Sequence, residues 1–132
     1  MAKTDSIVQE QGVVDISLPT IVDLSAKQYR FVKRNATTGN IEAAGANEQP
    51  LGVLQNAPNG ATRTTTAHVR LLGVSKLKVA GTVTPGSWIN SDTNGEGLAN
   101  TTNNRPSGAI ALCDGTSADL ISVMVIPSVM GA

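Results

Sequence analysis

The chain has 132 residues, of which 40% are hydrophobic and 15% are charged, which is about the length of one domain. This composition excludes a charge-rich disordered chain. Ten Lys and Arg residues balance ten Asp and Glu residues, so there is no overall basic field that would hold nucleic acid or an anionic membrane by charge alone.

Aromatic residues make up only 2% of the sequence, namely Tyr29, Phe31 and Trp88. The core must therefore be built from Val, Ile, Leu and Ala. Thr favours strands, whereas Gly, Asn and Ser favour turns. The composition predicts an all-β domain, and no segment has the sustained helical periodicity of a long bundle.

Residues 1–12 are polar and of mixed charge, with Ile7 and Val8 as their one apolar spot, and we predict an extended N-terminal arm. The start has no apolar run long enough for a signal peptide, and the most apolar stretch, 120–126, is far shorter than a membrane span. The single cysteine, Cys113, excludes an intrachain disulfide. These features predict synthesis in a cytoplasm and folding without disulfides.

The first strand is predicted from alternating residues between Val14 and Leu18, half-buried and ending at Pro19, and residues 21–24 continue it after a bend. Ser25 and Gln28 have the spacing of a capping box. Because residues 29–34 are rich in aromatic and β-branched side chains, we expect one helical turn followed by a strand. A longer helix across 25–34 is the alternative.

The remaining chain alternates short apolar segments with turn residues. Turns are expected at 37–40, 56–60, 84–86 and 92–97. Strands are expected at 41–44, 51–54, 64–72, 76–79, 87–90, 109–113 and 120–126. About nine short strands roughly ten residues apart predict a small β-barrel or sandwich.

The sequence contains an internal similarity at an offset of 56 positions, which we call the sequence echo. Residues 37–52 and 93–108 share six identities in sixteen positions without a gap. The shared residues include Gly, Pro and Asn, which determine turn geometry. We predict a repeated strand-and-turn unit, about 23–56 and 79–112, within a single domain that covers 13–132. The identical pairs are Thr37/Thr93, Gly39/Gly95, Ala43/Ala99, Asn47/Asn103, Pro50/Pro106 and Gly52/Gly108.

No residue pattern points to catalysis, to a cofactor site or to a metal site. His68 is the only histidine and belongs to an alternating strand, which favours a surface position. Cys113 has no neighbouring His that would activate it. The segment 92–96 lacks most ligands of a calcium loop and is typical of a hairpin turn. We therefore expect a protein that is not an enzyme and uses no cofactor.

One local basic cluster consists of Arg30, Lys33 and Arg34, interleaved with Tyr29 and Phe31. Basic and aromatic residues together can form a platform for single-stranded nucleic acid. On a strand, however, Arg30 and Arg34 share one face while Phe31 and Lys33 point to the other. This pattern favours a solvated strand face, and no direct nucleic-acid partner is expected.

Five segments, in this order along the chain, resemble small bacteriophage capsid decoration, or cement, proteins, and more loosely the head decoration protein of lambda-like phages. The resemblance covers about residues 20–126 and implies a β-rich body on the outside of an icosahedral shell, without catalytic residues. The segments are Asp23–Lys33, Gln49–Leu54, Val69–Val74, Val79–Trp88 and Ser91–Gly95.

The resemblance implies a structural virion protein on the outer capsid surface. It would bind the expanded shell and bridge neighbouring major capsid protein subunits, which stabilises the head. Self-association is expected, with a trimer favoured and a dimer possible. By position, the arm would contact the capsid protein, and its residues Ser6, Ile7, Val8 and Gln9 are the candidates for adding a strand to a capsid sheet edge.

The alternative function is a β-sandwich binding module of a phage tail or baseplate, which would bind a receptor or a carbohydrate. Sugar binding usually requires exposed aromatic rings, and Trp88 alone could supply one. We favour the interpretation of Trp88 as a core anchor.

Overall fold

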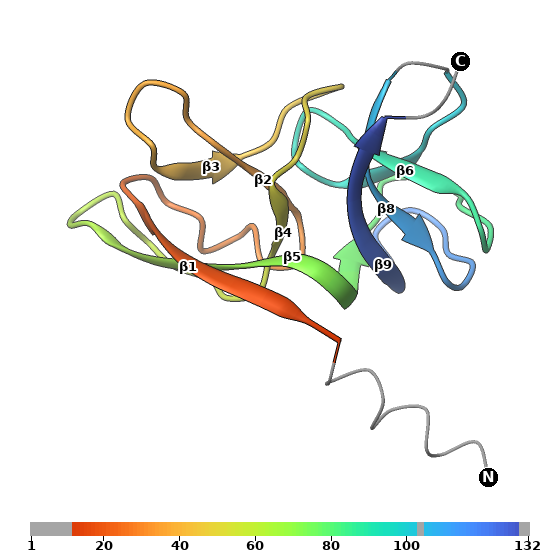
Figure 1. Cartoon of the computed structure of the whole chain (residues 1–132), viewed down its shortest axis with the longest axis horizontal. Helices are drawn as coiled ribbons and strands as arrows, with labels where there is room; N and C mark the ends of the chain where they lie inside the picture. The colour runs from red at the N-terminus through yellow and green to blue at the C-terminus, as the bar shows by residue number, and fades with distance from the viewer. Residues whose placement is uncertain (1–11, 103–104, 130–132) are drawn as a thin grey trace, which may run out of the picture.

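A computed structural model describes residues 12–102 and 105–129 (Figure 1). In this part of the chain the protein is all-β, as the sequence predicts, and no helix has the length and apolar character to cross a bilayer. The strands are β1 (Val14–Thr20), β2 (Phe31–Arg34), β3 (Ile41–Ala43), β4 (Gly52–Leu54), β5 (Thr65–Lys78), β6 (Trp88–Ser91), β7 (Gly97–Ala99), β8 (Pro106–Ala111) and β9 (Leu120–Val129).

The strands form one antiparallel sheet in the order β3-β2-β4-β5-β9-β8-β6-β7, and β1 pairs with β5 beside this path. The sheet curls into a half-barrel, which agrees with the expected barrel or sandwich class. Figure 1 shows β5 running between the two halves of the molecule. Its first part pairs with β1 and β4, and its second part, from Gly73 onward, pairs with β9.

The two halves have the same strand order. The first half runs β1-β5-β4-β2-β3, and the second runs β5-β9-β8-β6-β7. Gly39 and Gly95, which are equivalent in the sequence echo, both have positive φ, 77° and 81°, a conformation that glycine adopts without steric cost. The geometry thus repeats, whereas a duplicated origin stays a prediction. Asn103 of the echo lies outside the described residues.

Phe31 joins the two halves. Its side chain is fully buried in the cluster that contains the core residues of β6, β8 and β9. Its backbone N–H donates to the Gly95 carbonyl at 2.7 Å, and its own carbonyl accepts from the Ala44 N–H at 3.1 Å. The ring lies so close to Gly108 that a Cβ at that position would overlap it. A second, aliphatic cluster fills the first half, made of Leu24, Val32, Ile41, Leu54, Ala67 and Val69.

Three local expectations about the first half are wrong. The first strand does not stop at Pro19, which pairs with Thr66 inside β1; an edge strand tolerates proline because one of its edges needs no ladder hydrogen bonds. The strand is also not half-buried, since Val14 and Ile16 are 48% and 37% exposed. Neither the helical turn at 25–28 nor the longer helix forms, because this segment consists of turns.

Two strand boundaries also differ from the expectation. The strands expected at 64–72 and 76–79 are one continuous strand, β5, of 14 residues. Tyr29 has φ 62°, a region that is costly for a bulky residue, so β2 starts only at Phe31. The hairpin turn expected at 92–97 is confirmed, since Ser91 pairs with Gly97 across it.

We predict that Phe31→Ala lowers the free energy of unfolding by about 3–5 kcal/mol, because it removes a buried ring and leaves a cavity. Chemical denaturation measures this loss. Leu120→Ala, at a side chain that is 54% exposed, is the control and should change stability by less than about 0.5 kcal/mol. A loss below about 1 kcal/mol for Phe31→Ala would contradict the role of Phe31 as the joint between the halves.

Candidate interaction surface

The sheet face that points away from the core, which we call the outer face, has an apolar row. Side chains alternate between the two faces of a strand. Ile110, Met124 and Val74 each lie between two buried residues, and Trp88 precedes the buried Ile89. Trp88 pairs with Ile110, Ile110 with Met124, and Met124 with Val74. Large, partly exposed apolar side chains therefore cross four neighbouring strands, β6, β8, β9 and β5.

Trp88 is the first residue of this row. It is half-buried, and the fully buried residue next to it is Ile89, which belongs to the core cluster. The structure thus places the indole on the outer face beside Ile110, and the role of Trp88 as a core anchor stays a prediction.

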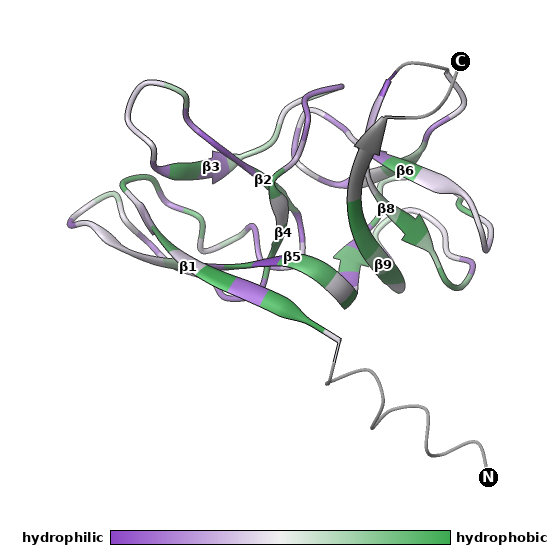
Figure 2. Ribbon diagram, in the orientation of Figure 1, coloured by the Kyte–Doolittle hydropathy of each residue, from purple (hydrophilic) through white to green (hydrophobic). Residues whose placement is uncertain are grey.

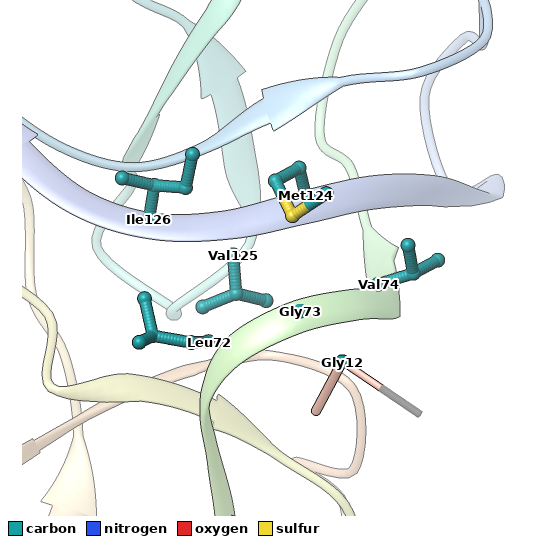
Figure 3. A pocket seen from close by; sticks show the side chains of 7 residues that line it. All are labelled: Gly12, Leu72, Gly73, Val74, Met124, Val125 and Ile126. Atoms are coloured by element: carbon teal, nitrogen blue, oxygen red, sulfur yellow. The ribbon is translucent and has the colours of Figure 1, made fainter. Parts of the chain in front are cut away.

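An apolar groove of about 440 Å³ continues the row on its β5 side. It lies where β1 and β9 meet along β5, since Val14 pairs with Leu72 and Val125 pairs with Gly73. Figure 3 shows Gly12 at its rim and the β9 side chains across from β5. The groove is lined by Gly12, Leu72, Gly73, Val74, Met124, Val125 and Ile126.

Gly73 gives the groove its shape. Its φ is +109°, and a Cβ built on it would lie 2.8 Å from the Val13 Cα. Only glycine therefore allows β5 to pass this close to the start of β1. The same close approach places Gly12, the first described residue, at the groove.

The strand β1 presents a further apolar surface. Within the described residues it pairs with β5 alone, so its other edge is open for pairing. Figure 2 shows apolar residues along β1, and Val14 and Leu72 are 48% and 46% exposed. An open edge with apolar side chains is the geometry that strand addition requires.

Polar contacts hold β1 to β5 beside this apolar surface. The guanidinium of Arg70 donates to both carboxylate oxygens of Asp15, at 2.8 and 3.0 Å. This bidentate pair holds the pKa of Asp15 below its ordinary value, mainly through the hydrogen bond from Arg70 and against the opposing effect of burial. Next along the pair, Ser17 Oγ and His68 Nδ1 are 2.8 Å apart.

A polar pocket of about 260 Å³ adjoins the groove and shares Val74 with it. The Lys76 ammonium lies 5.7 Å from the centre of the Tyr29 ring, within the range of a cation–π contact. Arg70 forms part of the same wall, so the apolar groove has a basic neighbour.

The basic cluster found in the sequence is dispersed over separate partners. Lys33 Nζ lies 2.6 Å from Glu48 and 3.4 Å from Glu42. Arg30 pairs with Glu96 at 3.7 Å, whereas Arg34 donates to the Gly39 carbonyl. Arg34 is exposed, as expected for a solvated strand face. The Arg30 side chain is only 15% exposed, so it departs from that expectation.

The other candidates of the sequence stay apart from one another. His68 is exposed, and Cys113 is half-buried against the core cluster. In the described residues, no group of three or more His, Cys, Asp or Glu side chains is placed to hold a metal ion. The candidate capsid-binding residues Ser6, Ile7, Val8 and Gln9 lie outside the described residues.

The outer row and the groove were not recognised from the sequence. Their members come from strands that lie far apart along the chain, and each strand alone shows only ordinary alternation. One signal was available in β9. Val123 and Val125 face the core, but Met124 and Ile126 on the opposite face are apolar as well, and a strand that is apolar on both faces indicates contacts on both.

The fold has a counterpart among solved structures. It is similar to the N base of the head fiber protein gp8.5 of bacteriophage phi29, with a TM-score of 0.69 and 12% sequence identity. The match covers 91% of this chain and 99% of that chain. No protein-family model and no curated protein matches the sequence.

We predict that Gly73→Ala destabilises the protein more than Gly86→Ala. Both glycines have positive φ, +109° and +87°, but no atom lies within 4 Å of a Cβ at Gly86. The Gly86 variant therefore reports backbone strain alone, about 1–2 kcal/mol, and the Gly73 variant adds the collision with Val13. Thermal or chemical unfolding measures both, and equal losses would show that β1 does not depend on this close approach.

We also predict that Asp15→Asn lowers stability at pH 7 by about 0.5–1 kcal/mol, the range for a solvent-accessible ion pair. Folding lowers the pKa of Asp15 from its ordinary value of 3.8. The stabilisation by the Asp15–Arg70 pair is therefore fully present above about pH 3.8 and is lost as the pH falls through the folded-state pKa. Denaturation curves at several pH values should show the two proteins converging in acid. A difference that stays constant down to pH 2 would exclude the carboxylate as its source.

Proposed function

We propose that this chain is a structural protein of a bacteriophage virion, bound to the outer surface of the capsid. The observation that carries the proposal is the shared fold with the base of a phage head fiber, which extends over 91% of this chain and 99% of the other. The order of segments that resembles capsid decoration proteins supports the same class from the sequence side.

The outer face supplies a surface suited to such a role. A row of apolar side chains across four strands, with the groove beside it, can bury contact area against another protein. We propose that Trp88 and Met124 lie in the contact with the major capsid protein. Since apolar burial is the main source of affinity in such contacts, this face would supply most of the binding energy.

The finer proposal is that the protein bridges neighbouring capsid subunits in the expanded shell and stabilises the head. A ligand that binds one state of a shell and not the other shifts the equilibrium toward the bound state. The arm residues Ser6 to Gln9 would add a strand to a capsid sheet edge, and a second contact made by one molecule increases its avidity. Catalysis has no part in this proposal.

Self-association belongs to the same proposal, with a trimer favoured over a dimer. Identical copies would place their exposed apolar residues, among them Ile21 and Val22 at 47% and 38% exposure, against one another and cover them.

We predict that the purified protein co-sediments saturably with expanded shells and does not co-sediment with unexpanded ones, because maturation creates the site. Deletion of residues 1–12 should leave the body folded and weaken binding, on the order of tenfold or more if a strand pairing is lost. Circular dichroism of the truncated protein is the control for folding.

Two outcomes would contradict parts of this account. Unchanged occupancy after the deletion would remove the arm from the interface. Binding to neither kind of shell, with the protein folded and in excess, would contradict the capsid role and favour the binding module of a tail or baseplate.

A further inference from the structure

We infer that in the free protein the N-terminal segment Asp5–Glu10 folds back on its own domain, with Ile7 and Val8 in the apolar groove between β5 and β9. This inference concerns the protein before it meets any shell. It goes beyond the proposed function and does not depend on capsid binding.

The segment Asp5–Glu10 is attached to the body close to the groove. Gly12 is one of the groove's lining residues, so the part that precedes it starts at the rim. Val8 is four residues upstream, a distance of about 13 Å in extended chain. No heavy atom lies within 4 Å of a Cβ at Gly12, which leaves space there for the chain to turn back.

The chemistry of the segment matches the groove. The groove is lined by Leu72, Val74, Met124 and Ile126 together with glycines and Val125, and Ile7 and Val8 are the only branched aliphatic residues before Gly12. A volume of about 440 Å³ lies within the range of pockets that hold drug-sized ligands. It therefore has room for two aliphatic side chains.

Charge favours the same occupant. Asp5 and Glu10 flank Ile7 and Val8 in the sequence, and the polar pocket that adjoins the groove contains Lys76. Lys76 forms none of the ion pairs among the described residues. An acidic–apolar–acidic segment can therefore place its aliphatic side chains in the groove and a carboxylate beside Lys76.

Docking in the groove would compete with the proposed capsid contact. The residues that fill the groove are those proposed to pair with a capsid strand, and one segment cannot occupy both sites. Binding to a shell would therefore displace the arm from the groove, at a cost in free energy that the shell contact must exceed.

Disulfide trapping tests the inference in the full-length protein. The double variant Val8→Cys with Met124→Cys, made in a Cys113→Ala background, is oxidised at low protein concentration. A docked arm brings the two sulfur atoms together in one chain, so an intramolecular disulfide should form at least about tenfold faster than in the control pair. The control is Val8→Cys with Leu98→Cys, since Leu98 is 37% exposed on β7 and does not line the groove.

Mass spectrometry under non-reducing conditions distinguishes the products, and circular dichroism confirms that both variants are folded. Equal rates for the two pairs would overturn the inference, since the arm would then have no preferred position. A product that is mainly a disulfide-linked dimer would also overturn it, because the groove would then hold the arm of a second copy. Neither result tests whether the protein binds to shells, which the co-sedimentation experiment measures separately.

Discussion

The burial of Phe31 between the two half-sheets is the contact on which the rest of the structure depends. With aromatic residues at 2% of the chain, the cores are built mainly from Val, Ile, Leu and Ala, and Phe31 is the largest fully buried side chain of the described residues. Phe31 comes from the first half but is buried in the cluster of the second. Its backbone N–H also donates to the Gly95 carbonyl of the second half, so both the ring and the backbone of Phe31 connect the halves.

The long strand β5 also links the halves, because it pairs with strands of both. Its outward face, however, carries apolar side chains that stay partly exposed. Its inward residues Ala67, Val69 and Leu77 are fully buried. Its outward residues Leu72 and Val74, together with β9, form the groove. Within the residues that the structure describes, no second layer covers this outer face, so the apolar side chains there remain available to other segments or proteins.

The sequence predicts those parts of the fold that depend on local alternation and turn chemistry. The buried Ala67 and Val69 and the exposed His68 between them follow from the period of a strand. The continuity of β5 through Gly73 could not be predicted, because glycine ordinarily marks a break, and here it is required by the close approach of Val13. The outer row escaped prediction for a similar reason: Trp88 and Met124 meet only through the pairing of β6, β8 and β9.

We propose that the outer face is the surface through which this protein contacts the capsid. Oxidative footprinting of Trp88, which lies in the outer row and does not line the groove, tests this proposal most directly. Hydroxyl radicals would be applied to the free protein and to the protein on expanded shells, and oxidation of each residue would be quantified by mass spectrometry. We predict that Trp88 becomes protected on the shell while Leu98 of β7, which is 37% exposed, keeps its reactivity. Unchanged oxidation of Trp88 in protein that is bound to the shell would contradict the proposal.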